Sequence, residues 1–303
     1  MKKILCVCFS PAIQKTVFFE NVKIGEVNRC EKYRLDAGGK AVNSARVLEQ
    51  LEKGSSSLIC PVGIKSEELF SSFLASDGIN FSLVKISGST RECVTLIDKN
   101  CTVTTELVLN EPNPNCDFSV YQQEFLSLVQ KEICNCDALL ISGSVGDCWA
   151  KEMPFLVGKI ANTAKKLLFL DMCGAVLKSM LSFCHVDFIK INEKEFCESF
   201  EIPFGQKDEI LKNEIVCVSK KIDVAIVVTR GKKSTMAVKD GKYVEIPTEN
   251  LEKIVNTTAC GDSFNAGFLH AFVNGSSFEN ALAKGTWCAA RNAQNERPGA
   301  ILN

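Results

Sequence analysis

The sequence contains few residues of several kinds, and each shortage limits what the protein can be. Its 303 residues include only 2 histidines, 2 tryptophans and 3 tyrosines. Lys and Arg total 35 and Asp and Glu total 36, so neither sign of charge is in excess. This balance argues against binding of a nucleic acid or an anionic membrane through bulk charge. We therefore expect neither of them as a partner.

Long apolar runs are also missing. The first apolar run, Ile4–Phe9, is too short for the core of a signal peptide, and Pro11 follows it closely. No stretch approaches the roughly 20 apolar residues that a membrane span needs. On this basis we predict a cytoplasmic protein whose thiols stay reduced.

Cysteine is abundant, with 16 residues, but the usual spacing of zinc ligands is absent. The close pairs, Cys6 with Cys8 and Cys134 with Cys136, are separated by one residue rather than by two. We interpret the cysteines as small apolar residues buried in strands and helices.

Apolar runs of strand length alternate with longer helical patterns along most of the chain. This alternation predicts an α/β fold with a mostly parallel sheet covered by helices on both faces. The expected strands are Ile4–Phe9, Ser57–Cys60, Ala138–Ser142, Leu167–Asp171, Val186–Ile191 and Val224–Thr229. The expected helices are Ala41–Lys53, Ser66–Ser76, Ser119–Ile133, Trp149–Lys165, Asp208–Lys221, Gly261–Asn274 and Phe278–Ala293.

Two regions, about 15–35 and 91–110, interrupt this alternation. They contain short segments of alternating polarity without intervening helices, which is typical of hairpins. We predict that they form a small β-sheet attached to a single domain that spans residues 1–303. Exposed strands seek partners, so this sheet could join two copies of the chain as a homodimer.

The strongest candidate for chemistry is the stretch Asn256–Phe268. Here the small residues Ala259, Cys260 and Gly261 precede Asp262 and an expected helix. Small side chains let a phosphate approach the backbone, where free N–H groups and the helix dipole favour negative charge. Asp262 can accept the proton of an attacking hydroxyl while these amides stabilise a transferring phosphoryl group. We expect the carboxylate to be ionised and a weak base; in this stretch alone, a simple helix cap is an equal alternative.

A second stretch, Asp36–Leu48, places Gly38 and Gly39 before Lys40 and Asn43. Two glycines allow a turn next to a ligand, and Lys40 supplies a positive charge for an anion. Asn43 lies about one helical turn further along and can both donate to and accept from a sugar hydroxyl. A plain helix N-terminus with a solvated lysine is the alternative.

Together these stretches resemble the PfkB, or ribokinase-like, carbohydrate kinases. Within that family the chain is similar to the branch of the 1-phosphofructokinases and tagatose-6-phosphate kinases. The resemblance covers essentially the whole chain in order, through Ser10–Thr16, Gly25–Arg29, Ala37–Asn43, Ser89–Arg91, Ser142–Ser144 and Asn192–Glu195.

The resemblance implies a three-layer α/β/α sandwich with a small β-sheet lid. It implies that ATP with Mg²⁺ phosphorylates a hexose phosphate of the fructose 1-phosphate or tagatose 6-phosphate type. Transfer would be in line, with Asp262 as general base and the amides of Ala259, Cys260, Gly261 and Asp262 as an anion hole. Whether a monovalent cation takes part is left open.

The resemblance also assigns binding residues. The sugar phosphate would meet Gln14, Arg29, Gly38, Gly39, Lys40, Asn43, Arg91 and Ser142; the charges of Arg29, Lys40 and Arg91 suit the phosphate already present. The nucleotide would meet Asn192, Thr229, Gly231, Thr257 and Asn292. Glu195 would act on magnesium through water.

The chain departs from the family pattern mainly where the sugar is expected. Gln14 stands where the family has an aspartate, and Cys93 replaces an asparagine. In the anion hole, Ala259 replaces a glycine and would resist a positive φ. Cys260 places a thiol beside the phosphate. If the helix N-terminus stabilises its thiolate, oxidation would inhibit the protein.

Two further functions therefore stay open beside the sugar-phosphate kinase. One is a PfkB kinase for an unphosphorylated sugar or a nucleoside, against which the arginines and Lys40 argue. The other is a non-catalytic sugar-phosphate sensor, against which Asp262, Asn192 and Glu195 argue. A Rossmann dehydrogenase is poorly supported, because no Gly-x-Gly-x-x-Gly follows the first strand.

Overall fold

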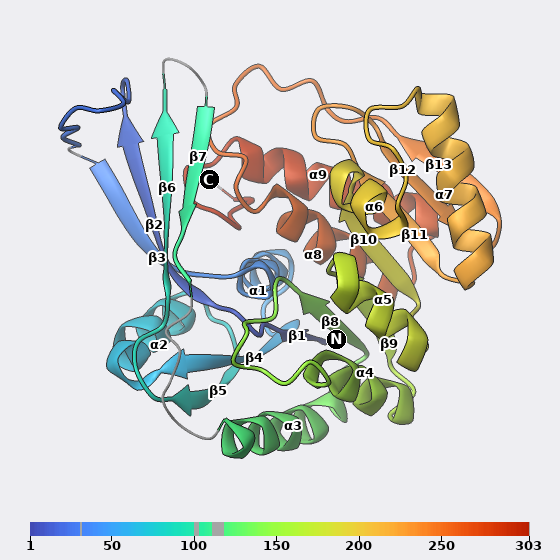
Figure 1. Ribbon diagram of the computed structural model, residues 1–303, viewed down its shortest axis with the longest axis horizontal. Coiled ribbons are helices and arrows are strands. Elements are labelled where there is room, and N and C mark those ends of the chain that lie inside the picture. Colours follow the sequence, from blue (N-terminus) through green and yellow to red (C-terminus); the bar gives the residue numbers. More distant parts are fainter. Residues whose placement is uncertain (31, 100–102, 111–117, 303) are drawn as a thin grey trace.

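The strands of the chain form two sheets in the computed structural model, which describes residues 1–30, 32–99, 103–110 and 118–302. Within these residues, one sheet has nine strands and the other has four. The larger sheet forms the centre of the main body, and the smaller one stands at its side (Figure 1).

The central sheet has the strand order β13-β12-β11-β10-β9-β8-β1-β4-β5. All neighbours from β5 through β1 to β11 are parallel, and β12 and β13 add an antiparallel hairpin at one edge. The predicted mostly parallel sheet is therefore confirmed. Its strands are β1 (Ile4–Val7), β4 (Ser56–Gly63), β5 (Phe81–Ile86), β8 (Ala138–Ser142), β9 (Leu167–Asp171), β10 (Phe188–Asn192), β11 (Ala225–Thr229), β12 (Thr235–Lys239) and β13 (Lys242–Ile246).

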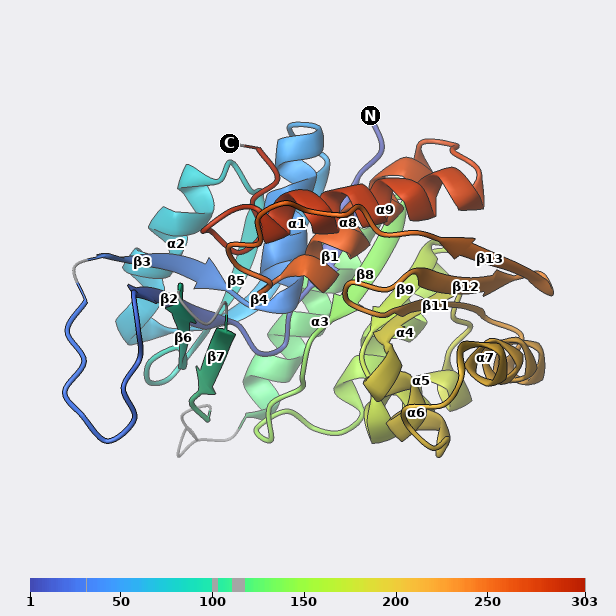
Figure 2. The ribbon, with the colours of Figure 1, turned by 90° about the horizontal axis from the view of Figure 1, so that it is seen from above.

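Helices cover both faces of this sheet, as Figure 2 shows from above. One layer contains α1 (Lys40–Leu51), α2 (Glu67–Ser76), α8 (Cys260–Val273) and α9 (Phe278–Ala293), and a short 3₁₀ turn, Ile64–Ser66, precedes α2. The other layer contains α3 (Ser119–Ile133), α4 (Met153–Thr163), α5 (Gly174–Phe183), α6 (Glu193–Phe200) and α7 (Asp208–Ile222).

Each helical layer encloses its own apolar core because successive strand residues point to opposite faces. In β1, Leu5 and Val7 belong to the core under α3–α7, whereas Ile4 and Cys6 belong to the core under α1, α8 and α9. A strand buried on both faces must be apolar throughout, which is why these strands read as continuous apolar runs. The three-layer α/β/α sandwich expected from the resemblance is confirmed.

The second sheet is the lid, with the order β3-β2-β6-β7. Its strands are β2 (Ala12–Phe19), β3 (Lys32–Gly38), β6 (Glu92–Asp98) and β7 (Val103–Val108). They come from the two regions that lacked helical patterns, so the predicted small sheet is confirmed, although β2 begins a few residues before the expected range.

Several expected elements differ from the structure. The predicted helix Trp149–Lys165 is too long, because α4 begins only at Met153. Trp149 instead packs its ring against Phe9 and donates its indole N–H to the Phe9 carbonyl. The strand expected from Val186 begins at residue 188. Helices α5 and α6 were not predicted, because runs of 10 and 8 residues are too short to show a clear helical period.

The interpretation of the cysteines is confirmed for the buried ones and wrong for others. Among the described cysteines, Cys6, Cys8, Cys60, Cys136, Cys197 and Cys288 are buried, whereas Cys30, Cys134, Cys173 and Cys217 are exposed. In the part of the chain that the structure describes, no helix combines the length and the apolarity needed to cross a membrane.

Candidate active site

A cavity of about 1430 Å³ opens between the lid and the carboxyl ends of the central strands. Strands β2, β6 and β7 line one side, and the ends of β8 to β11 with the N-termini of α1 and α8 line the other. Ligands of open α/β sheets bind at this position. The volume exceeds the roughly 300–1,000 Å³ that is common for a single ligand, so two substrates can be held together.

Most of the residues predicted as site residues line this cavity. They are Gln14, Gly39, Lys40, Asn43, Arg91, Asn192, Glu195, Thr229, Gly231, Thr257, Ala259, Cys260, Gly261 and Asp262. Chain segments far apart in the sequence therefore meet here, as the carboxyl-end rule predicts.

Four predicted residues are placed outside the cavity lining. Arg29 is exposed in the connection between β2 and β3, and Gly38 and Ser142 are buried behind the surface. Asn292 is buried in α9, where its amide donates to the carbonyl of Thr258 at 2.8 Å. Its amide thus supports the loop before α8 from behind.

Gly39 turns the chain from the lid strand β3 into α1. Its φ is +122°, and a Cβ there would lie 2.9 Å from the Cys8 Sγ and 3.2 Å from the Pro11 Cα. Only glycine fits this conformation and this approach. The turn brings Lys40 and Asn43, on the first turn of α1, into the cavity.

The loop before α8 is the segment for which we predicted an anion-binding turn. Ala259 is the N-cap of α8 and has a φ of 66°, a strained value for alanine that costs about 1 kcal/mol. The amides of Gly261 and Asp262 belong to the first helical turn, where no carbonyl of the same helix can accept from them. The amide of Cys260 already donates to the Thr257 carbonyl at 3.3 Å.

Lys190 of β10 approaches this turn, and the sequence patterns did not indicate it. Its side chain is 5% exposed, and its Nζ lies 2.6 Å from the position that a Cβ would take at Gly261. The absence of a side chain at Gly261 therefore lets an ammonium group lie against the first turn of α8. Lys190 was overlooked because it stands inside an apolar strand run.

Asp171, the last residue of β9, binds both cavity lysines. Its two oxygens lie 3.2 Å from the Nζ of Lys190 and 3.4 Å from the Nζ of Lys40, and the Asn265 amide donates to it at 2.6 Å. Burial alone would raise the pKa of Asp171, but these partners hold that pKa well below its usual range. The charge of Asp171 in turn raises the pKa of Lys40 far above its ordinary value, so both stay charged.

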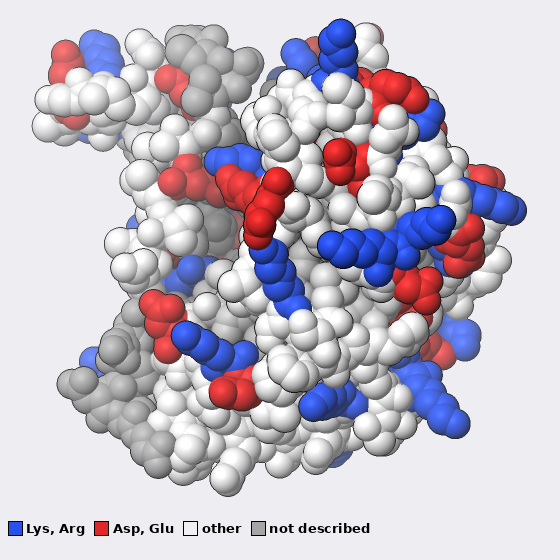
Figure 3. All heavy atoms as spheres, turned by 45° about the vertical axis from the view of Figure 1, so that its right-hand side comes forward, with Lys and Arg blue, Asp and Glu red and all other residues white. Residues whose placement is uncertain are grey.

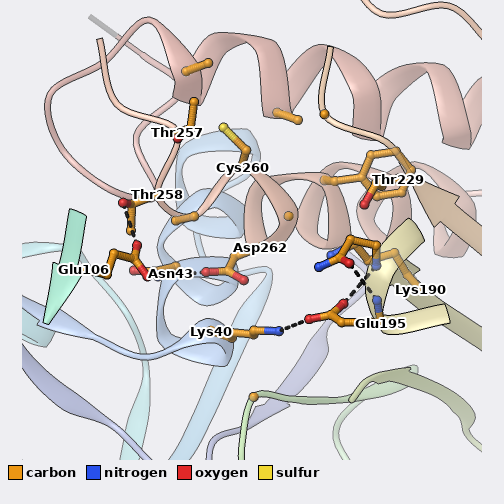
Figure 4. Close-up of a pocket in the computed structure, with 18 of the residues that line it drawn as sticks. Lys40, Asn43, Glu106, Lys190, Glu195, Thr229, Thr257, Thr258, Cys260 and Asp262 are labelled. Carbon is orange, nitrogen blue, oxygen red and sulfur yellow. Dashed lines mark hydrogen bonds and ion pairs between the residues drawn. The ribbon is translucent and has the colours of Figure 1, made fainter. Parts of the chain in front are cut away.

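Asp262 of α8 is buried and accepts a hydrogen bond from a side chain of α1. The Asn43 Nδ2 donates to Asp262 Oδ2 at 2.8 Å (Figure 4). Burial first, and then the negative charge of Asp171, raise the pKa of Asp262 to about 6, against the opposing effects of Lys40, Asn43 and Lys190. The expectation of a weak base is therefore wrong, because the tertiary environment makes this carboxylate a stronger base than its helix position suggests.

The thiolate suggested for Cys260 is not supported. Burial raises the pKa of the Cys260 thiol to about 11, although the Asn292 amide contacts its sulfur at 3.3 Å. The thiol is therefore protonated at neutral pH. Burial outweighs the favourable helix dipole at this position.

Glu195 lies in the first turn of α6, beside Lys40. Its backbone N–H donates to the Asn192 side chain, and its Oε2 accepts from the Asn192 N–H, which forms a capping box. Its other oxygen lies 3.6 Å from the Lys40 Nζ (Figure 4). The described residues contain no group of three potential ligands for a metal. A single accessible carboxylate suits Mg²⁺, which keeps several waters and takes its remaining oxygens from phosphates.

On the lid side, the polar groups are mostly bound to each other. The Gln14 amide donates to the Thr95 hydroxyl at 2.8 Å, so its carbonyl oxygen is the group left for a ligand. Glu106 of β7, which the sequence analysis missed, accepts from the Thr258 hydroxyl at 2.9 Å and joins the lid to the anion-binding loop (Figure 4).

Arg91, directly before the lid strand β6, differs from the other cations of the cavity. Its guanidinium donates to the carbonyls of Ser10 and Pro11 at 3.0 and 3.3 Å. Among the described residues, no carboxylate forms an ion pair with it, whereas Lys40 and Lys190 both pair with Asp171. Its charge is thus available to an anion near the lid.

The fold and the cavity define a class: an α/β/α sandwich whose lid sheet covers a cavity large enough for two small ligands. The chain belongs to the pfkB family of carbohydrate kinases, whose family model matches residues 3–302. It is accordingly an ATP-dependent sugar kinase.

Individual relatives agree with this family. A curated 1-phosphofructokinase of Borreliella burgdorferi is 28% identical over 281 residues, which cover 91% of this chain and 87% of that protein. A structure of a possible 1-phosphofructokinase of Thermotoga maritima has a TM-score of 0.85 and 19% identity, over 98% of this chain and 93% of its own. Phosphofructokinase-2 of Escherichia coli with fructose-6-phosphate has a TM-score of 0.84 and 18% identity, over 97% and 94%. The structural likenesses support the fold.

The charged side chains on one face of the molecule are of mixed sign. On the face drawn in Figure 3, Lys and Arg are interspersed with Asp and Glu rather than gathered in an area of one sign. This distribution matches the formal net charge of −1.

Proposed function

We propose that the chain transfers the γ-phosphoryl group of ATP to a hydroxyl of a hexose phosphate of the fructose 1-phosphate or tagatose 6-phosphate type. One observation carries this proposal. The Asp262 carboxylate, the first-turn amides of α8 and the Lys190 ammonium occupy one corner of the cavity. A base and a site for phosphoryl charge thus lie side by side.

In the proposed reaction the sugar hydroxyl oxygen attacks the γ-phosphorus in line with the leaving oxygen. The new O–P bond forms as the bond to the β–γ bridging oxygen breaks, and that electron pair leaves with ADP. Asp262 accepts the hydroxyl proton. The amides of Gly261 and Asp262, with Lys190, stabilise the charge on the transferring group.

We assign Mg²⁺ to the side of the cavity near Glu195, where ATP phosphates and water supply most of its ligands. The metal, when bound, neutralises charge on the β- and γ-phosphates. Glu195 is held in place by its capping box with Asn192, and Lys40 beside it balances its charge.

The proposed second anion site is at Arg91. A planar guanidinium without a carboxylate partner suits bidentate binding of the phosphate already on the sugar. The relatives named as phosphofructokinases support this assignment. The Gln14 carbonyl oxygen would accept from a sugar hydroxyl nearby.

The test is a screen of ADP release with fructose 1-phosphate, tagatose 6-phosphate, fructose 6-phosphate, fructose and ribose. It is run with Mg²⁺ and with either potassium or sodium, since Escherichia coli phosphofructokinase-2 has also been solved in complex with potassium. We expect turnover with a sugar phosphate. Turnover with unphosphorylated sugars alone would reject the proposal, and binding without turnover would favour a sensor.

Replacing Arg91 separates the two kinds of sugar substrate. We expect Arg91→Met to raise the KM for the sugar phosphate by roughly 10–100-fold, because a charge-assisted contact worth about 1.5–3 kcal/mol is lost. The KM for ATP should stay near that of the wild type. Lys99→Met is the matched control, because Lys99 pairs with Glu20 outside the cavity. Equal effects of both variants would argue against a phosphate site at Arg91.

We further propose that two copies associate through their lids. The lid edges β3 and β7 carry the exposed apolar side chains of Tyr33 and Leu107. Edge strands with apolar side chains favour pairing with another chain. Sedimentation velocity should show twice the chain mass for the wild type and a monomer for a variant with Tyr33→Glu and Leu107→Glu. A wild-type monomer at micromolar concentration would contradict the proposal.

A further inference from the structure

Arg46 of α1 is a buried arginine that the proposed chemistry does not yet use. Its side chain is 2% exposed. The Nε donates to Asp77 at 2.7 Å, and Nη2 donates to the carbonyl of Ala37 at 2.5 Å. The Nη1 donates to the carbonyl of Pro298 at 3.0 Å and to the Asn43 Oδ1 at 2.9 Å. All three guanidinium nitrogens are therefore engaged, as a buried charge requires.

Asn43 lies between Arg46 and Asp262. A side-chain amide has one donor end and one acceptor end, whereas a guanidinium can only donate. Arg46 therefore requires the amide oxygen of Asn43, which leaves the amide nitrogen to face the Asp262 carboxylate. Figure 4 shows the contact between Asn43 and Asp262. The opposite orientation would set two acceptors against each other and two donors against each other.

We propose that Arg46 is a positioning residue of the phosphoryl-transfer site, which fixes the orientation of the Asn43 amide and so keeps a hydrogen-bond donor on Asp262. The inference rests on the proposed function of Asp262 as the base. Arg46 itself does not line the cavity. It acts on the reaction only through Asn43.

The surrounding ion pairs hold the guanidinium in place. The second oxygen of Asp77 binds the Arg297 Nη2 at 2.7 Å, and the Arg297 Nε binds Asp36 of β3 at 2.7 Å. Asp77 follows α2, and Arg297 lies in the C-terminal segment. Side chains from β3, from the end of α2 and from the C-terminal segment thus hold the Arg46 guanidinium in one position. Loss of the ion pair with Asp77 leaves the hydrogen bonds of the two terminal nitrogens of Arg46 intact.

The expected consequence is a change in the pH dependence of the reaction. Asp262 faces Asp171 from β9, Lys40 from α1, Lys190 from β10 and Cys260 on its own helix. Lys40 and Lys190 favour the ionised carboxylate, and the Asn43 hydrogen bond adds to their effect, whereas burial and Asp171 oppose it. Without the Asn43 hydrogen bond, Asp262 would hold its proton to higher pH. The midpoint of the acid limb in the pH profile of kcat/KM would then shift to higher pH.

The experiment compares three variants of the full-length chain. Arg46→Met should move the acid limb up by roughly one pH unit, from the loss of one hydrogen bond to a charged group. Arg46→Lys, which still presents only donors, should leave it close to that of the wild type. Asp77→Asn is the matched control: it breaks an ion pair of Arg46 on the side away from Asn43, so it should lower Tm without moving the limb.

Two outcomes would overturn the inference. One is a folded Arg46→Met enzyme with an unchanged acid limb, and the other is an equal shift in Asp77→Asn, which would make the role purely structural. If Arg46→Met does not fold, NMR of the wild-type Asn43 side-chain amide decides: its signals should titrate with the midpoint of the acid limb, and a constant signal rejects the inference. Near-normal turnover of Asp262→Asn would instead remove the base itself, so the two failures are distinguishable.

Discussion

Asp262→Asn is expected to lose turnover by roughly 10²–10⁴-fold, the range typical of a general base. The amide has nearly the same shape and can still accept from the Asn43 Nδ2, so the site geometry is preserved. It cannot accept the proton of the attacking hydroxyl. ATP binding, measured by calorimetry, should stay within a few-fold of the wild type.

The same substitution should make the protein more stable at neutral pH. The ordinary pKa of an aspartate is near 3.8, and burial raises the pKa of Asp262 to about 6. The folded chain thus binds the proton more tightly than the unfolded chain, and ionised Asp262 destabilises the fold above about pH 6. The cost is absent below about pH 4, grows between about pH 4 and pH 6, and reaches roughly 3 kcal/mol above that range.

The measurement is therefore a pair of pH profiles, one of turnover and one of Tm. Turnover and Tm of the wild type and of Asp262→Asn are compared from pH 4 to pH 8. We expect the gain in Tm to be largest at pH 8 and absent near pH 4, while turnover of the variant is low throughout. Near-normal turnover would remove Asp262 from the role of base. An unchanged Tm would show that burial of the ionised Asp262 carboxylate costs little stability.

Lys190→Met has the second large expected effect, a fall in kcat of roughly 10²–10³-fold. The substitution keeps the length of the side chain and removes the ammonium beside Gly261. The charge that develops on the transferring phosphoryl group then loses a fixed, buried partner. Because Lys190 also favours the ionised form of Asp262, the acid limb should move to higher pH.

Two further variants define the cause of this loss. Lys194→Met removes the same charge from an exposed ion pair with Glu198 on α6, and it should leave kcat unchanged. Gly261→Ala keeps the lysine but places a Cβ 2.6 Å from its Nζ, too close for both to stay in place, so it should lower kcat in the same way. A Lys190→Met enzyme with kcat within three-fold of the wild type would show that Lys190 only balances Asp171.

For the proposed base, the sequence predicted the position of the residue but not its pKa. The small residues before Asp262 indicated a phosphate-binding turn, and the cavity lining agrees with that position. The chemical character of the carboxylate was not predictable. It depends on burial and on Asp171, which is 91 residues away in the chain and is brought close only by the sheet.

The cationic residues of the cavity were also predicted only in part. Lys40 and Arg91 stood in motifs and line the cavity, whereas Arg29, in a motif as well, is exposed outside it. Lys190 gave no signal, because one charged residue in an apolar strand does not reveal which side chains surround it. Asp171 could have been suspected as the polar end of an apolar strand, where functional residues gather.

The sequence by itself determined the layered α/β fold, the separate lid and most of the segments that line the cavity. These features depend on local periodicity and on short motifs, which are readable along the chain. Only the tertiary structure decided the partners of Lys190, the proton affinity of Asp262 and the hydrogen bond that links Arg46 to Asn43. Those properties arise from distance and burial between residues remote in sequence, and both are set when β9, β10, α1 and α8 pack together.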